Sequence, residues 1–292
     1  MLKRITCLAL SVVILLSFWT QQVIAAGNES VIPTPVELPS VEVQPEIKIP
    51  EGPQLYVNGT LVENAALTYH KGIAYVSLRA ASQALRPDAT ITWEQNQAVI
   101  SAEGLHFTID PNNTYVTANN RCLFIPEGIL CENGTIRIPA RVISKVFDAE
   151  FSHSLDTQDI KLTSGSGALI PADQFYNKDD LYWLSHIIYA ESGNQPLAGK
   201  IAVGNVVMNR VADPVFPNSI YGVVFQKNQF TPVKNGTIHL TPNEESVLAA
   251  KLCLEGAVIL PTALWFNRAK GNSWAAKHKE YITTIGSHDF YV

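Results

Sequence analysis

The pattern of apolar and polar positions divides the chain into a β-rich part and a helical part. Short apolar runs separated by turn signals such as Asn58-Gly59 and Asn133-Gly134 predict strands and hairpins over residues 55–163. Further along, apolar residues recur at helical spacing, beginning with Leu181, Leu184, Ile187 and Ile188. The pattern predicts an α+β protein with two folded domains: a β-rich domain at 55–163, and a mostly helical domain with a small β element at 173–292.

The β-rich region contains an internal repeat. Residues 72–82 match residues 134–144, and each copy continues into a short helix and then a strand pair. Neither strand-helix-hairpin unit buries its apolar face alone, so we expect the two units to pack as a pair. Arg79 and Arg141 occupy equivalent positions in the two copies. This equivalence favours a structural role in helix–strand contact over ligand binding.

The first helix of the second domain carries the candidate catalytic residue. Acidic residues stand in its first turn, and it runs to Glu191 before stopping at Ser192-Gly193. The negative end of the helix and the apolar neighbours both disfavour a carboxylate, so the pKa of Glu191 is expected to be raised. A glutamic acid of this kind can donate a proton near neutral pH. An ordinary surface glutamate that ends a helix is the alternative.

Two further helices are predicted after Glu191. One opens at Pro196 and contains Gly199 and Gly204, which we expect to permit close packing against the first helix. The sequence Thr-Pro-Asn-Glu at 241–244 predicts a capping box for the next helix, which ends near Gly256.

Two segments are predicted to be linkers. Residues 26–54 contain six prolines, which predicts an extended, semi-rigid segment, with a passive tail as the alternative. Residues 164–172 begin with Ser-Gly-Ser-Gly and predict a flexible Ser/Gly linker between the two domains.

The N-terminal residues and the composition limit the class of protein. Residues 1–25 combine Lys3 and Arg4 with an apolar run and with Val23-Ile24-Ala25, which is the layout of a secretory signal peptide. An uncleaved membrane anchor is the alternative, although the run is short for a membrane span. We therefore expect an exported protein with no mature transmembrane segment. A chain of 292 residues with 47% apolar residues and a net charge of −5 has ample core material, and it is a poor candidate for binding nucleic acid.

Export permits disulfides. Cys122 and Cys131 flank a Pro-Glu-Gly turn signal and form a candidate pair, whereas Cys253 lies in an apolar helical pattern and is expected to be a buried free thiol. The histidines are scattered without the spacing of metal ligands, so no metal site and no other cofactor is expected.

The β-rich region resembles the copper amine oxidase N-terminal-like stalk domain of secreted Gram-positive proteins. The resemblance rests on the pattern strand, Ser or Pro, any residue, Arg, helix and hairpin at 72–82 and 134–144. Despite its name, the resemblance implies no oxidase chemistry. For this stalk domain, we consider contact with the cell wall or with another wall protein.

The second domain resembles the spore-cortex-lytic cell wall hydrolases of the SleB/CwlJ type. Its blocks at 190–211, 216–230, 264–267 and 285–291 follow the order of that family. The resemblance implies a lysozyme-like fold and a secreted, wall- or spore-associated enzyme that cuts peptidoglycan glycan strands, notably the spore cortex in germination. Glu191 matches the catalytic acid of the family. Six more residues match motif positions and are candidates for binding the saccharide, with core packing as the alternative: Gln226, Gln229, Phe230, Trp265, Asn267 and His288.

One departure from the family pattern bears on the reaction. Many members have Gly-Glu where this chain has Asn194-Gln195. Glycosidases with two carboxylates need a second acid, whereas a lytic transglycosylase works with one. The departure favours transglycosylation with Glu191 as the single acid and base, with Asp289 left as a candidate second carboxylate. The alternatives are a catalytically weakened wall- or spore-coat-binding protein and a zinc amidase, although the chain has no His-Glu-x-x-His motif.

Overall fold

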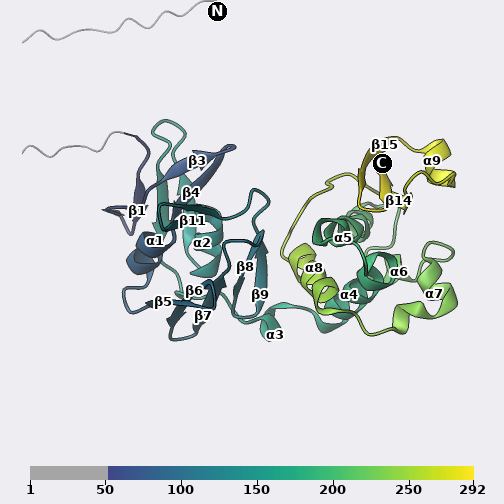
Figure 1. The fold of residues 1–292 in the computed structure, drawn as a ribbon, viewed down its shortest axis with the longest axis horizontal. Helices are drawn as coiled ribbons and strands as arrows, with labels where there is room; N and C mark the ends of the chain where they lie inside the picture. Colours follow the sequence, from purple (N-terminus) through teal and green to yellow (C-terminus); the bar gives the residue numbers. More distant parts are fainter. Residues whose placement is uncertain (1–51) are drawn as a thin grey trace, which may run out of the picture. The chain divides into compact units, whose positions relative to one another are not determined.

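The computed structural model describes residues 52–292, so the predictions for the signal peptide and for most of the proline-rich segment lie outside the described residues. The α+β class is confirmed, because strands predominate up to residue 163 and helices predominate after it (Figure 1). Within the described part, no helix combines the length and the apolar character that crossing a membrane requires.

The strands of the β-rich part form three sheets within the described residues. The first sheet has the order β12 (Glu150–His153), β13 (Ile160–Thr163), β1 (Leu55–Val57) and β2 (Thr60–Leu61). The second has the order β10 (Leu130–Glu132), β11 (Thr135–Pro139), β4 (Ile73–Ser77) and β3 (Thr68–His70). The third has the order β5 (Thr90–Glu94), β6 (Gln97–Ala102), β7 (Leu105–Ile109), β8 (Tyr115–Ala118) and β9 (Arg121–Phe124).

The two repeat units meet along one strand pair. Each unit runs from a strand of the second sheet through a short helix, α1 (Leu78–Leu85) or α2 (Ala140–Val146), into a hairpin, β5–β6 or β12–β13. Strands β4 and β11 pair antiparallel, with Val76 opposite Ile138, its counterpart in the repeat. An antiparallel pair that joins equivalent residues has a local two-fold axis through it. Both units contribute to a single hydrophobic core.

Helix α5 (Leu197–Ala212) is the centre of the helical part. It contacts α4 (Lys178–Ser192), α6 (Ile220–Val224) and α8 (Glu244–Leu254). A Cβ atom on Gly204 would lie 2.5 Å from Sγ of Cys253 on α8 and 3.0 Å from Cδ1 of Ile188 on α4. Glycine at this position therefore lets the three helices approach closely, as the sequence predicts. Cys253 is buried and free, which confirms the expectation for this thiol.

Short elements complete the helical part. They are α3 (Ala172–Phe175), α7 (Thr231–Asn235), the 3₁₀ helix η1 (Thr237–His239), α9 (Trp274–His278) and a sheet in the order β14 (Trp265–Arg268), β16 (His288–Tyr291) and β15 (Tyr281–Ile285). Helix α8 begins after Asn243, whose Oδ1 accepts a hydrogen bond from the amide of Ser246 at 2.9 Å. The predicted capping box, with Thr241 as the cap, is therefore placed two residues too early.

The segment 164–172 is attached at several points to the β-rich part, residues 55–163, which we call the stalk domain from here on. Leu169 is buried in the stalk core, and the amide of Ala172 donates to the carbonyl of Asn119 at 3.0 Å. A side chain at Gly165 would collide with the carbonyl of Asp148. The expectation of a flexible linker rests on composition, and it does not account for these tertiary contacts.

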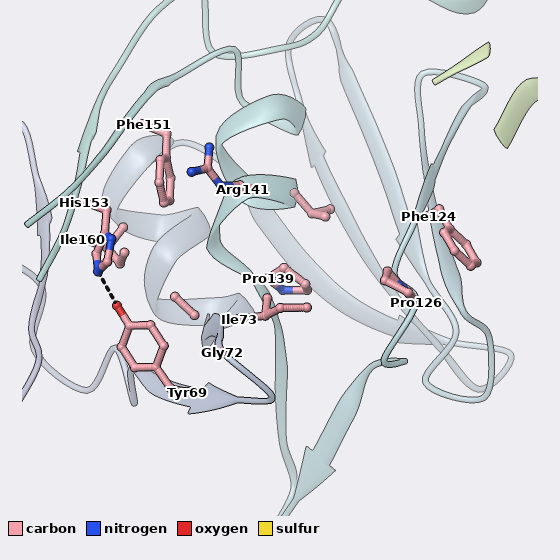
Figure 2. Close-up of a pocket in the computed structure, with 12 residues that line it drawn as sticks. Tyr69, Gly72, Ile73, Phe124, Pro126, Pro139, Arg141, Phe151, His153 and Ile160 are labelled. Carbon is pink, nitrogen blue, oxygen red and sulfur yellow. Dashed lines mark hydrogen bonds between the residues drawn. The ribbon is translucent and has the colours of Figure 1, made fainter. Parts of the chain in front are cut away.

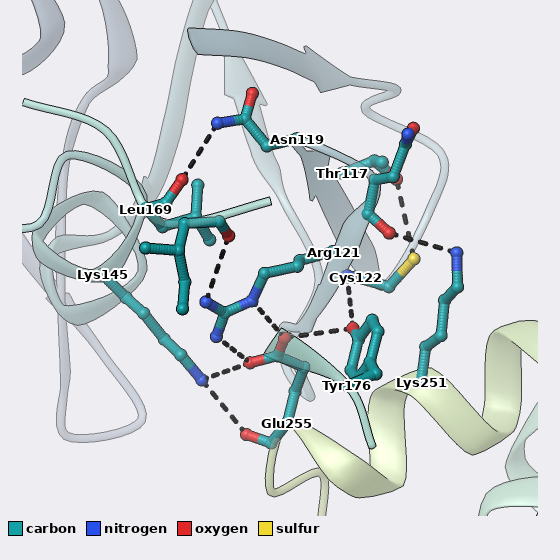
Figure 3. Close-up of polar contacts among 11 residues, drawn as sticks. Thr117, Asn119, Arg121, Cys122, Lys145, Leu169, Tyr176, Lys251 and Glu255 are labelled. Atoms are coloured by element: carbon teal, nitrogen blue, oxygen red, sulfur yellow. Dashed lines mark hydrogen bonds and ion pairs between the residues drawn. The ribbon is translucent and has the colours of Figure 1, made fainter. Parts of the chain in front are cut away.

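A cluster of charged residues joins the end of α8 to the stalk domain (Figure 3). The carboxylate of Glu255 accepts hydrogen bonds from Arg121 of β9 at 2.6 and 2.9 Å and from the hydroxyl of Tyr176 at 3.0 Å, and Lys145 of α2 lies 2.6 Å away. The Glu255 side chain is 1% exposed. Burial alone would raise the pKa of Glu255, but the hydrogen bonds from Arg121 and Lys145 outweigh burial and hold this pKa below its usual value. We call these four residues the Glu255 cluster.

Candidate active site

Glu191 lies at the end of α4, one residue before the helix stops. Asn177 begins this helix by accepting hydrogen bonds from the amides of Asp179 and Asp180 at 2.9 and 3.1 Å. Gly193 follows the helix, where a Cβ atom would lie 2.6 Å from the carbonyl oxygen of Tyr189. The tight turn therefore needs glycine, and it leaves the side chain of Glu191 half-buried beside it.

The end of α4 forms one wall of a cleft of 730 Å³. The opposite wall comes from α7, η1 and the residues that lead into α8. Glu191 is the single acidic residue among those that line the cleft: Tyr189, Ala190, Glu191, Gly193, Asn194, Thr231, Pro232, Asn235, Thr237, Leu240 and Asn243. A carboxyl group therefore faces a hollow whose other polar groups are hydroxyls and amides, which suits a polyhydroxylated substrate.

Burial raises the pKa of Glu191 to about 7. Within residues 52–292, no cation pairs with this carboxyl group to offset the cost of burying its charge. The apolar neighbours of Glu191 in the sequence predict a raised pKa, and the structure confirms this direction. A large fraction of Glu191 is therefore protonated near neutral pH, which is the state that a general acid requires.

The side chain of Gln195 holds the turn after Glu191 in place through hydrogen bonds. Its Oε1 accepts a hydrogen bond from the amide of Ser287 at 2.8 Å, and its Nε2 donates to Oδ1 of Asn194 at 2.8 Å. The buried ammonium of Lys200 donates to the carbonyl of Gln195 and also to the carboxylate of Glu245 on α8. Gln195 therefore connects the turn after Glu191 to the turn between β15 and β16. It does not line the cleft.

The cap of α8 also reaches this turn. Nδ2 of Asn243 donates to the carbonyl of Gly193 at 3.2 Å, while its Oδ1 caps α8. One asparagine thus holds the two walls of the cleft together.

Three of the six predicted saccharide-binding residues lie between α6 and α7. Gln226 and Gln229 are in the connecting loop, and Phe230 caps α7. Phe230 is buried, with its ring centroid 6.3 Å from that of Phe266 and 5.4 Å from Cζ of Arg210. None of the three lines the cleft. The packing of Phe230 favours the core alternative for that residue.

The other three lie in the small sheet and also do not line the cleft. Trp265 is half-buried, with Nζ of Lys279 3.6 Å from its ring centroid. Asn267 accepts a hydrogen bond from the hydroxyl of Ser273 at 2.5 Å. His288 is buried, and burial lowers its pKa. Saccharide binding by these residues stays a prediction, and it requires a surface beyond the cleft beside Glu191.

The predicted disulfide between Cys122 and Cys131 is not formed, and both cysteines are free. Cys122 lies on β9 and is buried against the core of the helical part. Cys131 lies on β10, in a different sheet, and is exposed. The turn signal between them connects two sheets instead of two strands of one hairpin, which explains the wrong prediction.

Most polar residues of the cleft lie outside the motif blocks. Thr231, Asn235, Thr237 and Asn243 fall between residues 230 and 244, a stretch for which the sequence suggested no role in binding a substrate. The available signal was Thr231-Pro232, because proline near a helix start predicts the helix that brings these residues opposite Glu191.

Asp289, the candidate second carboxylate, is engaged elsewhere. Its Oδ2 accepts from the amide of Lys270 at 2.8 Å, and its Oδ1 accepts from the hydroxyl of Thr284 at 2.5 Å. It does not line the cleft. Among the described residues, no group of three His, Cys, Asp or Glu side chains is placed to hold a metal ion.

The variant Gln195→Glu, which restores the carboxylate common in the family, is expected to leave the type of product unchanged. Position 195 supports the turn and does not line the cleft, so a carboxylate there is not placed to act on a substrate held in the cleft beside Glu191. Mass spectrometry of the released fragments measures this outcome. A switch from anhydro ends to reducing ends in the variant would contradict the supporting role that we assign to Gln195.

Known protein families match both the helical part and the β-rich part of the chain. The family model described as "Cell Wall Hydrolase" matches residues 194–291. The model described as "Copper amine oxidase N-terminal domain" matches residues 56–162. The hydrolase match begins three residues after Glu191, so the role of Glu191 depends on the geometry of the site.

Curated relatives carry the name spore cortex-lytic enzyme. The Bacillus cereus protein is 34% identical over 134 residues, which cover 46% of this chain and 51% of the relative. The Halalkalibacterium halodurans protein is 31% identical over 136 residues, covering 46% of this chain and 41% of the relative. The chain therefore spans about half the length of the curated relatives that it matches.

A solved structure also matches. The catalytic domain of the germination-specific lytic transglycosylase SleB from Bacillus anthracis is 32% identical, with a TM-score of 0.38, and the match covers 42% of this chain and all of that domain. The family matches lead to one assignment: the chain carries a domain of the cell wall hydrolase family at its C-terminal end, preceded by a copper amine oxidase N-terminal domain.

Proposed function

We propose that this protein cleaves the glycan strand of peptidoglycan as a lytic transglycosylase, with Glu191 as its single general acid and base. The observation that carries the proposal is the position of Glu191. It is the one carboxyl group among the residues that line the cleft, and burial raises its pKa to about 7. The names of the relatives, spore cortex-lytic enzyme and germination-specific lytic transglycosylase, support the spore cortex as the substrate.

The reaction needs one group that first donates and then accepts a proton. Protonated Glu191 donates its proton to the glycosidic oxygen as the bond to C1 of the muramic acid breaks. The resulting carboxylate then accepts the proton of the muramic acid C6 hydroxyl as that oxygen bonds to C1. The product carries a 1,6-anhydro end, no water is consumed, and Glu191 returns to its protonated form.

The proposed location and partners follow from this substrate. A protein that acts on peptidoglycan must be exported, as the N-terminal residues 1–25 predict. We therefore infer a secreted protein associated with the cell wall or the spore, whose partner is the peptidoglycan glycan strand. Contact of the stalk domain with the wall or with another wall protein is part of the same proposal.

Mass spectrometry of the fragments released from purified cortex and from vegetative wall tests the proposed function. Fragments that end in 1,6-anhydromuramic acid are expected, and cortex is expected to yield more of them. Reducing ends would mean hydrolysis and would contradict the single-residue mechanism. Tight sedimentation with the wall without any soluble product would favour the alternative, a catalytically weakened wall-binding protein, which the absence of a carboxylate at Gln195 suggests.

The rate of cleavage is expected to fall as the pH rises through about 7. The first step uses protonated Glu191, whose pKa is raised to about 7, so the active fraction declines about tenfold per pH unit above that value. Initial rates on a soluble glycan between pH 5 and pH 9 measure the effect. A rate that rises through pH 7 would show that the carboxylate form is needed first, and it would contradict the proposed order of steps.

A further inference from the structure

The internal repeat of the stalk domain places two pockets at equivalent positions. The first has a volume of 330 Å³ and is lined by residues that include Tyr69, Arg141, Phe151 and His153 (Figure 2). We call it the closed pocket because these side chains contact one another. The second has a volume of 460 Å³ and is lined by residues that include Arg79, Ile91, Trp93 and Cys131. We call it the open pocket because its side chains lack those contacts.

The strand registers show which residues of the two pockets correspond. In the hairpin β5–β6, Trp93 is opposite Ala98, and in β12–β13, His153 is opposite Ile160. Trp93 therefore corresponds to His153. The residues two positions earlier, Ile91 and Phe151, correspond in the same way.

Two more pairs of pocket residues correspond, one in the second sheet and one in the internal repeat. Cys131 is opposite Ile136 in β10–β11, as Tyr69 is opposite Ala74 in β3–β4. Arg79 and Arg141 stand at the same place in the two repeat copies, near the start of α1 and α2. The same four positions thus line each pocket.

The closed pocket satisfies its own polar groups. The hydroxyl of Tyr69 and Nε2 of His153 form a hydrogen bond of 3.0 Å. The guanidinium of Arg141 lies over the ring of Phe151, with Cζ 4.2 Å from the ring centroid. These two contacts, visible in Figure 2, occupy the side chains that could otherwise receive a ligand. The structural role expected for Arg141 is therefore confirmed.

The open pocket has neither contact, because three of the four corresponding residues differ and only the arginine is shared. Ile91 offers no aromatic ring to Arg79, and Cys131 has no hydroxyl to offer Trp93. Trp93 is 57% exposed. Arg79 is exposed and has no hydrogen-bond or ion-pair partner within residues 52–292, so the structural role expected for Arg79 is not borne out. Glu63 lines an adjoining hollow with Arg79 without forming an ion pair. An exposed tryptophan and an arginine that is unpaired among the described residues therefore line the same open pocket.

We propose that the open pocket is a carbohydrate-binding site for a muramyl unit of the glycan strand. The apolar face of a pyranose ring stacks on an exposed tryptophan, because the indole offers a large flat surface at low cost in conformational entropy. A carboxylate carried on the muramyl lactyl group or its stem peptide pairs with Arg79, whose planar fork suits bidentate recognition. The choice of a muramyl sugar rests on the proposed function, since it is this function that brings glycan strands to the protein.

The indole N–H signal of Trp93 in a nitrogen-15 NMR spectrum tests the proposal directly. The protein is the full chain carrying Glu191→Gln, so that no probe is consumed, and the signal is assigned by its loss in Trp93→Phe. Three probes are compared: a disaccharide-tetrapeptide muropeptide, chitobiose, which has no carboxylate, and the free tetrapeptide, which has no sugar. We expect the muropeptide to shift the signal saturably, chitobiose to bind at least about tenfold more weakly, and the tetrapeptide to cause no saturable shift.

Two arginine variants provide a matched comparison. Arg79→Gln is expected to weaken muropeptide binding at Trp93 about tenfold, whereas Arg141→Gln, in the closed pocket, is expected to leave it unchanged. Circular dichroism confirms that each variant is folded. Equal weakening by both variants would overturn the assignment to the open pocket.

Other outcomes also decide the proposal. No saturable shift at Trp93, an equal shift with the free tetrapeptide, or equal affinity for chitobiose would each overturn the proposed ligand. Failure of the proposed function is a separate result, since cleavage by the chain with Glu191 intact does not enter the measurement. Binding at Trp93 by a chain that releases no fragments would refute only the enzyme, and cleavage without binding at Trp93 would refute only the site.

Discussion

Replacing Glu191 with glutamine is expected to lower the rate of peptidoglycan cleavage by about 10²–10⁴-fold. Glutamine fills nearly the same volume but cannot donate a carboxyl proton to the glycosidic oxygen or take one from the C6 hydroxyl. Because Glu191 is the one carboxyl group among the residues that line the cleft, no neighbour there can replace it. Initial rates of fragment release from cortex, compared with the unmodified chain, measure the loss.

The loss in Glu191→Gln should not come from unfolding. A carboxyl group whose pKa is raised in the folded state contributes stability at low pH, and this contribution is lost as the pH rises through about 7. The neutral amide avoids that loss, so the variant should be at least as stable as the unmodified chain at pH 8. Asp179→Asn, at an exposed position in the first turn of the same helix, is the matched control and should keep full activity. Full activity in Glu191→Gln would end the proposed mechanism.

Replacing Glu255 with alanine is expected to destabilise the protein by about 3–5 kcal/mol. The carboxylate is 1% exposed and binds Arg121, Lys145 and Tyr176, and Arg121 is itself only 6% exposed. Removing the acid leaves a buried guanidinium without its partner, which costs far more than the loss of a surface ion pair. Urea denaturation at neutral pH measures the change in the free energy of unfolding.

The pair between Arg137 and the exposed Glu132 supplies the control for Glu255→Ala. The Glu132 side chain is 65% exposed, so Glu132→Ala should cost less than about 1 kcal/mol. The contribution of Glu255 also depends on pH. Because its folded-state pKa is lowered, the stability that it adds is present above the unfolded pKa of about 4.3 and is lost as the pH falls below that value. A cost for Glu255→Ala no larger than that of Glu132→Ala would contradict the structural role of the cluster.

The Glu255 cluster also connects the stalk domain, through helix α8, to the turn after Glu191. Glu255 follows α8 at its C-terminal end, and Asn243 at the opposite end bonds to the turn after Glu191. Helix α8 therefore joins the Glu255 cluster at its C-terminal end to the wall of the cleft at its N-terminal end. The sequence around α8 gives no hint of this connection, because Glu255 lies 134 residues from Arg121 and 79 residues from Tyr176.

The features that depend on local order could be predicted from the amino-acid sequence. The α+β class, the helix that ends at Glu191 and the direction of its pKa shift follow from periodicity and from neighbours in the chain. The close packing at Gly204 and the buried thiol of Cys253 follow from helical spacing in the same way.

The folded chain alone shows which distant residues meet. It placed Cys122 and Cys131 in different sheets, and it brought Thr231, Asn235 and Thr237 opposite Glu191 while leaving Phe230 in the core. It brought Phe151 to Arg141, whereas the equivalent Ile91 offers Arg79 no ring to contact. The physical reason is common to these cases: local patterns set the conformation of each segment, whereas burial and partnership depend on contacts between segments far apart in the chain.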